Sequence, residues 1–248
     1  MRQTILFDLD DTLIHCNKYF NVVIQQFVDT MLTWFAGHGL TEEAIKQKQL
    51  DLDLAGVEVH GFKAEQFPQS FIETYHYYCD TFGIRARTEN ERWLSQLGHS
   101  VYAHSIEPYP NMEPTLQSLT EQGHELFLYT GGDATIQMRK VEEAGLNRYF
   151  GERIFVALHK TREFMETLIH TQDFERSRTW MIGNSVRTDV MPALESGIHA
   201  IYIPAQLEWK YNVVDITATP KGAFFTLPSL AEVPKIISDY TGQRAVNL

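Results

Sequence analysis

The sequence is poor in cysteine and in basic residues. Only two cysteines, Cys16 and Cys79, are present, and neither belongs to a C-x-x-C pair, so neither a disulfide framework nor a cysteine zinc site is indicated. Lysine plus arginine number 21 against 32 aspartate plus glutamate, which gives a formal charge of -11. This balance argues against a nucleic-acid backbone or an anionic membrane as the main partner.

The sequence also lacks a long apolar run. No stretch approaches the length of a membrane span, and no signal peptide precedes the first predicted strand. Together with the scarce cysteines, this pattern predicts a cytoplasmic protein. At 248 residues the chain is long enough for one large domain, or for one domain that carries an insertion.

The features that are present begin near the N-terminus, with the apolar run Ile5–Phe7 and the aspartates after it. The run is typical of a buried strand, and Asp8 and Asp10 occupy alternate positions at its C-terminal end, so both should face the same way. In an open parallel sheet, ligands bind at that end of the strands. Two carboxylates there suit a hard cation together with an anionic substrate.

These aspartates have two other possible interpretations. Aspartate is common in turns, so Asp8, Asp10 and Asp11 could simply end a strand. A calcium-binding loop would need glycine at its sixth position and glutamate at its twelfth, where this chain has Leu13 and Tyr19. The calcium loop is therefore excluded.

The segment from His15 to Ser105 has a helical pattern and no strand signal. Apolar and aromatic residues recur at helical spacing, and Thr41 can cap a helix that has Glu42 and Glu43 in its first turn. The segment is long for a connection between two strands of a sheet. We therefore predict a separate helical domain at residues 15–105, inserted into a domain made of residues 1–14 and 106–248.

Strands and helices alternate after this segment. Strands are predicted at residues 125–130, 154–156, 179–182, 199–203 and 223–226. Helices are predicted between them, including one over residues 186–196, and a capped turn is predicted at Ser229. Joined to the first strand, this alternation predicts an α/β fold, a doubly wound parallel sheet with helices on both faces.

Polar residues follow several of these predicted strands. Thr130 and Gly131 end one strand, Lys160 stands at a helix start, and Asn184 and Asp189 follow another strand. Each of these alone is compatible with an ordinary turn or a solvated side chain. Their order along the chain favours a shared functional role more strongly than any one of them does alone.

With Asp8, Asp10 and Thr12, these residues resemble the four motifs of the haloacid dehalogenase-like hydrolase superfamily. The family pattern D-x-D-x-T is met by the first three, its threonine or serine by Thr130, and its lysine by Lys160. Its closing G-D-x-x-x-x-D pattern is similar to Gly183-Asn184 through Asp189. The predicted helical insertion lies where one branch of the superfamily carries a cap domain.

The resemblance implies a Rossmann-like core and a phosphatase that works through an aspartyl phosphate. Asp8 would be the nucleophile. Asp10 would protonate the leaving alkoxide and then deprotonate the attacking water. Thr130, Gly131 and Lys160 would bind the phosphoryl oxygens.

The resemblance also implies Mg²⁺, held by the Asp8 side chain, the Asp10 backbone carbonyl and a carboxylate of the last motif. The chain departs from the commoner pattern at Asn184, whose amide can coordinate a cation but brings no charge. We therefore predict that Asp189 supplies the carboxylate, and that Asn184 orients it or a bound water.

The expected substrate is a small phosphate monoester such as a nucleotide or a sugar phosphate, since in this superfamily the cap closes over the site and selects the leaving group. The acid at Asp10 favours phosphoryl transfer over the dehalogenase and phosphonate-cleaving branches. A phosphomutase also has both aspartates, so this alternative stays open.

A binding or regulatory protein that has lost turnover, with Asn184 as its lesion, is a second alternative. The sequence leaves the oligomeric state open.

Overall fold

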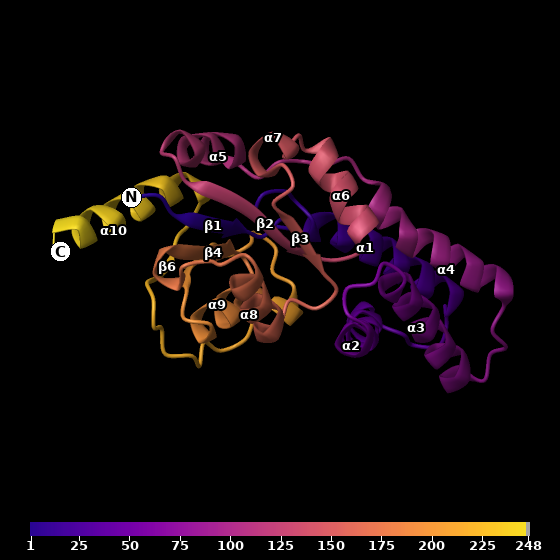
Figure 1. The fold of residues 1–248 in the computed structure, drawn as a ribbon. Coiled ribbons are helices and arrows are strands. Elements are labelled where there is room, and N and C mark those ends of the chain that lie inside the picture. Colours follow the sequence, from indigo (N-terminus) through magenta and orange to yellow (C-terminus); the bar gives the residue numbers. More distant parts are fainter. Residues whose placement is uncertain (247–248) are drawn as a thin grey trace. The chain divides into compact units, whose positions relative to one another are not determined.

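The computed structural model describes residues 1–246, and the chain divides into two compact units (Figure 1). One unit comprises Met1–His15 and Ile106–Leu248, and the other comprises Cys16–Ser105. The sequence predicted a division into residues 1–14 with 106–248 and residues 15–105. The roles of a catalytic core and a cap for these two units stay predictions.

The first unit is built on a six-stranded sheet in the order β3-β2-β1-β4-β5-β6. Every neighbouring pair is parallel, and β1 lies where the strand order reverses. The predicted doubly wound α/β fold is therefore confirmed. The strands are β1 Thr4–Phe7, β2 Glu125–Gly131, β3 Ile154–Ala157, β4 Thr179–Gly183, β5 His199–Tyr202 and β6 Phe224–Thr226.

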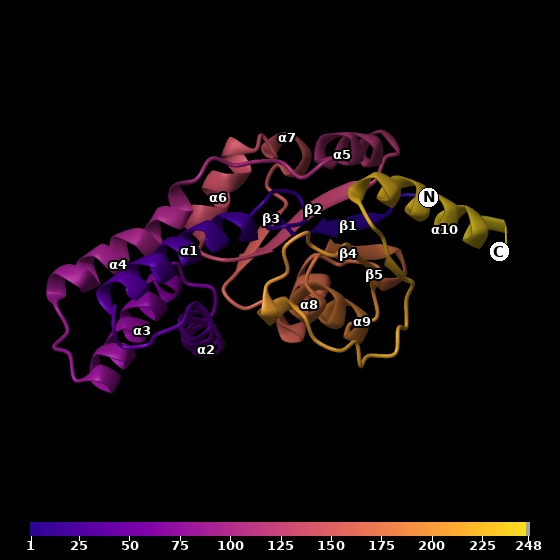
Figure 2. The same ribbon diagram turned by 180° about the vertical axis from the view of Figure 1, so that it is seen from behind.

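Helices cover both faces of this sheet, as Figures 1 and 2 show. One face packs against α5 Met112–Glu121, α6 Ala134–Glu143, α7 Asn147–Phe150 and α10 Val233–Val246. The other face packs against α8 Arg162–Thr171 and α9 Met191–Glu195.

The apolar character of β1 follows from its position between these two helical layers. Ile5 and Phe7 face the first layer and Leu6 faces the second, and all three side chains are fully buried. A central strand of a doubly covered sheet has no solvent face, so its apolar residues are consecutive rather than alternating. The chain can therefore place polar residues only where β1 ends, at Asp8 and beyond.

The second unit consists of α1 Asn17–Trp34, α2 Glu42–His60, α3 Gln66–Phe82, α4 Thr88–Ser100 and a short 3₁₀ turn at Val101–Ala103. The Thr41 side chain accepts a hydrogen bond from the Ala44 N–H, so the predicted cap of α2 is confirmed. The aromatic residues form the core, where the rings of Phe27 and Phe71 stack with centroids 4.2 Å apart.

Two local predictions were wrong, and one short helix was missed. The predicted helix at residues 186–196 is a π-helix at Val186–Val190 followed by α9, and the short helix α7 was not predicted. The Ser229 side chain makes no capping hydrogen bond, and a 3₁₀ turn follows at Leu230–Glu232.

No helix within residues 1–246 has both the length and the apolar character that a membrane span requires.

The buried face of α2 contains an acidic residue. Asp53 is 7% exposed and shares this face with Ile45, Gln49 and Val57. Burial raises the pKa of the Asp53 carboxyl to about 7. The folded chain therefore favours the neutral acid at a pH where the unfolded chain has a carboxylate.

We expect the Asp53→Asn variant to gain stability over wild type as pH rises. The folded-state pKa of Asp53 lies above its unfolded value, so the free energy of unfolding of the wild type falls as pH rises between the unfolded pKa and about pH 7. The full loss is on the order of 4 kcal/mol. Urea unfolding at pH 4 and pH 8 measures this difference. The exposed Asp51→Asn variant on the same helix is the control, and a difference for Asp53→Asn that does not grow with pH would contradict the account.

Candidate active site

The turn after β1 fixes the positions of Asp8 and Asp10. The Asp8 N–H donates to the Ile182 carbonyl of β4 over 2.9 Å, which extends the sheet by one residue. The chain then turns sharply, with Asp11 at a φ of 57° and the Leu13 N–H donating to the Leu9 carbonyl. Asp8 is left 7% exposed at the carboxyl edge of the sheet.

Thr12 connects the first motif with the last one. Its hydroxyl lies 3.2 Å from Asp8 Oδ2 and 3.4 Å from Asn184 Oδ1, and its side chain is fully buried. One hydroxyl proton is shared between these two acceptors. The amide oxygen of Asn184 is thereby held beside the Asp8 carboxylate.

Lys160 lies between two carboxylates of this site. Its Nζ donates to Asp8 Oδ1 over 2.7 Å and to Asp189 Oδ1, and the residue is 5% exposed. Its ammonium also lies 4.9 Å from the centroid of the Tyr129 ring. Burial opposes the charged form of Lys160, but attraction to Asp189 and Asp8 outweighs burial and raises its pKa.

The cost of burying a charge is offset less completely for Asp8 than for Lys160. Burial, together with the charge of Asp189, raises the pKa of the Asp8 carboxyl to about 7 against the lowering effect of Lys160. Asp8 and Asp189 also share the single ammonium group of Lys160, so negative charge exceeds positive charge among these three residues when both carboxyl groups are ionised. A cation bound next to Asp8 would stabilise the ionised form that a nucleophile requires.

Asp189 is held by the chain turn that follows β4. Its Oδ2 accepts the Ser185 N–H over 2.9 Å, and the residue is 1% exposed. A β-carbon on Gly183 would lie 2.1 Å from this same oxygen, so only glycine leaves room for the carboxylate. Asp189 belongs to the π-helix Val186–Val190, a distortion that is frequent at functional sites.

The structure also places residues at this site that sequence reasoning missed. Gln137 Nε2 donates to Thr130 Oγ1 over 2.6 Å and to Asp10 Oδ2 over 3.0 Å. Lys140 Nζ donates to both carboxylate oxygens of Asp10, over 2.8 and 2.9 Å. The available signal was two polar residues three apart on the helix that follows the Thr130 strand end, so that both share one face.

The predicted residues therefore assemble into two linked groups. Lys160 and Thr12 bring Asp8, Asp189 and Asn184 together. Gln137 brings Asp10 and Thr130 together, and Gly131 ends β2 directly after Thr130. The roles of these residues in binding and catalysis stay predictions.

The oxygen-rich donor set fits a hard divalent cation. The candidate donors are the carboxylates of Asp8 and Asp189, the Asn184 amide oxygen and the Asp10 carbonyl. Within residues 1–246, no three histidine, cysteine, aspartate or glutamate side chains converge into a complete metal site. A cation here would therefore need the amide and the backbone oxygen as well as the two carboxylates, and the excess negative charge at Asp8 favours its binding.

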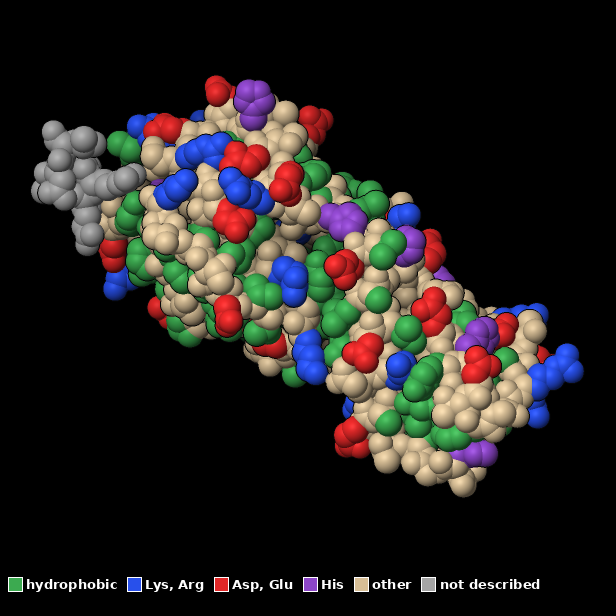
Figure 3. All heavy atoms as spheres, turned by 90° about the horizontal axis from the view of Figure 1, so that it is seen from below, with side chains coloured by type: hydrophobic (Ala, Val, Ile, Leu, Met, Phe, Trp, Pro, Cys, Tyr) green, Lys and Arg blue, Asp and Glu red, His purple; other side chains and the backbone are tan. Residues whose placement is uncertain are grey.

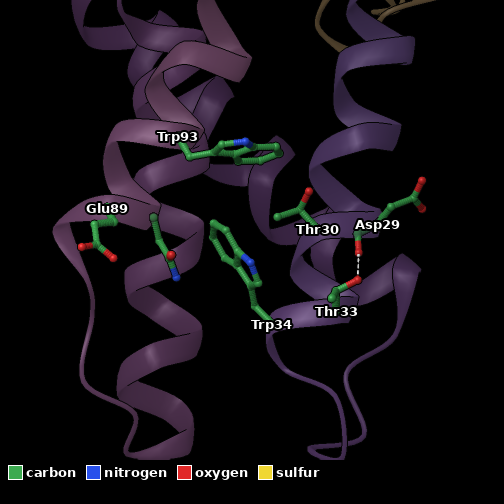
Figure 4. A pocket seen from close by; sticks show the side chains of 7 residues that line it. Asp29, Thr30, Thr33, Trp34, Glu89 and Trp93 are labelled. Atoms are coloured by element: carbon green, nitrogen blue, oxygen red, sulfur yellow. Dashed lines mark hydrogen bonds between the residues drawn. The ribbon is translucent and has the colours of Figure 1, made fainter.

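A separate groove lies within the helical unit (Figure 4). The rings of Trp34 and Trp93 meet edge to face there, with centroids 5.7 Å apart. The remaining lining residues are Asp29, Thr30, Thr33, Glu89 and Asn90. None of the predicted catalytic or metal-binding residues lines this groove.

Comparisons with known proteins show the family of the chain. A family model for haloacid dehalogenase-like hydrolases matches residues 3–197. The chain belongs to this family. The predicted resemblance is thereby confirmed, and the protein is a hydrolase.

Relatives of the chain include proteins named as phosphatases. A glyceraldehyde 3-phosphate phosphatase from Methanocaldococcus jannaschii is 25% identical over 96% of this chain and 98% of its own length. A pyrimidine 5′-nucleotidase, PynA, from Streptococcus pneumoniae is 24% identical over 82% of this chain and 85% of its own length.

Solved structures support the same fold. A haloacid dehalogenase-like family hydrolase from Xanthomonas campestris superimposes with a TM-score of 0.78 and 24% identity, over 98% of this chain and 97% of that one. The hydrolase YfnB from Bacillus subtilis superimposes with a TM-score of 0.68 and 17% identity, over 96% of this chain and all of that one. At these identities the likeness concerns the fold alone.

We expect the Gly183→Ala variant to lose hydrolytic activity by about 100-fold, the scale of loss for a 1 Å displacement in an active site. The added methyl would take the place of the Asp189 carboxylate and displace it. Hydrolysis of 4-nitrophenyl phosphate measures the effect, and circular dichroism checks that the variant is folded.

The matched control is Gly242→Ala, because a β-carbon there meets nothing within 4 Å. This control should keep the wild-type rate. A folded Gly183→Ala variant with the wild-type rate would show that the position of Asp189 is not required.

Proposed function

We propose that this hydrolase of phosphate esters is a magnesium-dependent phosphatase, which cleaves a small phosphate monoester through an aspartyl-phosphate intermediate. The observation that carries the proposal is that the two aspartates at the end of β1 have different surroundings. Asp8 is buried against Lys160 and Thr12, whereas Asp10 is held apart from them by Gln137 and Lys140. Such a pair of carboxylates in different surroundings suits a nucleophile and an acid.

In the first step, a carboxylate oxygen of Asp8 attacks phosphorus. A bond forms between this oxygen and phosphorus, and the bond between phosphorus and the ester oxygen breaks. The electron pair of that bond stays on the departing oxygen, which takes a proton from the Asp10 carboxylic acid. The products are an alcohol and a phosphorylated Asp8.

In the second step, water attacks the phosphorus of the aspartyl phosphate. Asp10, now a carboxylate, accepts the proton that the water loses. The bond between phosphorus and the Asp8 oxygen breaks, which releases inorganic phosphate and restores the Asp8 carboxylate. Asp10 ends the cycle protonated, as it began.

Three groups bind the phosphoryl oxygens in this proposal. Lys160 supplies a buried positive charge, and Gly131 supplies a backbone N–H. The Thr130 oxygen accepts a hydrogen bond from Gln137, so its own proton is directed to another acceptor. A phosphoryl oxygen at the strand end is the acceptor that we propose.

Magnesium would neutralise negative charge on the phosphoryl group and on Asp8 when bound. The Asp8 and Asp189 carboxylates and the Asp10 carbonyl would hold it, with Asn184 orienting Asp189 or a bound water. The oxygen donor set, and the two carboxylates that share one ammonium group, support this proposal. The solved structure of the related hydrolase YfnB is described as bound to magnesium.

The substrate that we propose is a small organophosphate of the sugar-phosphate or nucleotide class. Relatives named as a glyceraldehyde 3-phosphate phosphatase and a pyrimidine 5′-nucleotidase support this class. On the face shown in Figure 3, acidic and basic side chains are interspersed, unlike the basic surface that a nucleic acid would need. We propose that Cys16–Ser105 is the substrate-selecting cap and that the enzyme works in the cytoplasm.

The Asp8→Asn variant should lose at least about 10³-fold in turnover of 4-nitrophenyl phosphate, because the amide is not a nucleophile. The assay compares both proteins with and without Mg²⁺. The control is Asp173→Asn, since this exposed residue has a φ of 52° that asparagine tolerates. A folded wild type that turns over no phosphate ester in Mg²⁺ would contradict the proposal and favour a phosphomutase or a non-catalytic binder.

The Asp189→Asn variant should weaken Mg²⁺ activation more than Asn184→Ala, because only Asp189 brings a charge to the site. Titrating activity with Mg²⁺ for each variant gives the two apparent affinities. Equal apparent affinities would show that Asp189 is not the charged metal ligand.

A further inference from the structure

Asp10 is held by two residues of α6. Lys140 Nζ contacts both carboxylate oxygens of Asp10, and Gln137 Nε2 contacts Oδ2. The side chain of Lys140 is 12% exposed and that of Asp10 is 25% exposed, so this ion pair is shielded from much of the solvent. Without these donors, a partly exposed carboxyl group would rotate about its side-chain bonds.

The local sequence fixes α6 in the place that these contacts require. The Asp133 side chain accepts the N–H groups of Thr135 and Ile136, which caps the helix directly after the end of β2. Gly132 has a φ of 145°, and a β-carbon there would lie 2.9 Å from the Gln137 side chain. The turn thus leaves space for Gln137, which is 2% exposed.

Gln137 also joins the two groups that act on a phosphate ester. Its Nε2 donates one proton to the acid Asp10 and one to the phosphate-binding hydroxyl of Thr130. An amide nitrogen has two protons, so both donations are satisfied at once. The distance from the acid to the phosphoryl site is therefore set by one side chain.

Proton transfer to a leaving group depends on such placement. The acid must lie within hydrogen-bond reach of the ester oxygen while Asp8 attacks phosphorus. An error of about 1 Å in position can cost 10²-fold in rate. Two donors on the Asp10 carboxyl reduce its freedom to leave that position.

We propose that Lys140 and Gln137 are positioning residues that hold Asp10 for proton transfer to the leaving oxygen and from the attacking water. The proposal rests on the proposed phosphatase mechanism. It assigns to the two residues a role in leaving-group departure, and Lys140 acts on the substrate only through Asp10.

The test compares 4-nitrophenyl phosphate with phenyl phosphate, which have a similar shape. 4-Nitrophenolate departs without a proton, whereas phenolate is more basic and gains more from an acid. The quantity measured is kcat/KM, which reports only the steps up to and including the first irreversible one. It therefore does not include hydrolysis of the phosphoenzyme, which both esters share. Lys140→Met should lose on the order of 10- to 100-fold with phenyl phosphate and less than about threefold with 4-nitrophenyl phosphate.

Two controls separate positioning from a general structural role, and a third variant serves as a substitute for Lys140→Met. Lys140→Arg retains two-oxygen contact with a carboxylate, so it should restore most of the phenyl phosphate activity. Arg148→Met removes a cation from an exposed pair with Glu113 and should leave kcat/KM unchanged for both substrates. Lys140→Gln carries the same expectation as Lys140→Met and replaces it if that variant does not fold.

The decisive comparison uses the Asp10→Asn background. There, adding Lys140→Met should leave the ratio of the two kcat/KM values unchanged, because Lys140 acts through Asp10. Equal losses with both esters, or a further change of the ratio without the Asp10 acid, would overturn the inference and leave the proposed phosphatase intact. A folded wild type that hydrolyses neither ester in Mg²⁺ would overturn the proposed function, and this inference with it.

Discussion

The candidate site depends on one buried ammonium group between two buried carboxylates. Lys160 contacts Asp8 and Asp189, and all three residues are at least nine-tenths buried. Removing the Lys160 ammonium would leave both carboxylates buried without this partner, which costs more than the contacts themselves. Each of the three residues therefore constrains the other two, and their segments of chain must meet at one edge of the sheet.

The sheet topology makes this meeting possible. Strand β1 lies at the point where the strand order reverses, between β2 and β4. The carboxyl ends of β3, β2, β1 and β4 consequently lie side by side, and the motif residues follow these ends. The apolar layers on both faces of the sheet leave the strand ends as the place where polar groups can gather. The same arrangement that buries the core thus concentrates charge at the candidate site.

Much of this arrangement could be predicted because it depends on local sequence. The run Ile5–Phe7 and the alternate placement of Asp8 and Asp10 indicate a strand end, and Thr41 indicates a helix start. Local patterns could not show how α6 packs. Gln137 and Lys140 meet Asp10 across 127 and 130 residues of chain, and that contact depends on tertiary packing. Nor does helical periodicity distinguish a π-turn such as Val186–Val190 from an ordinary α-turn, which is why the segment holding Asp189 was predicted as a regular helix.

The central claim of the account is that Asp8 becomes phosphorylated during turnover. The most direct measurement is rapid acid quenching during turnover of a phosphate ester in Mg²⁺, followed by borohydride reduction and peptide mass spectrometry. The account predicts a phosphorylated intermediate at Asp8, which borohydride reduces to homoserine at that position, and none in Asp8→Asn. Turnover by the wild type with no covalent phosphate, or with phosphate on another residue, would contradict it.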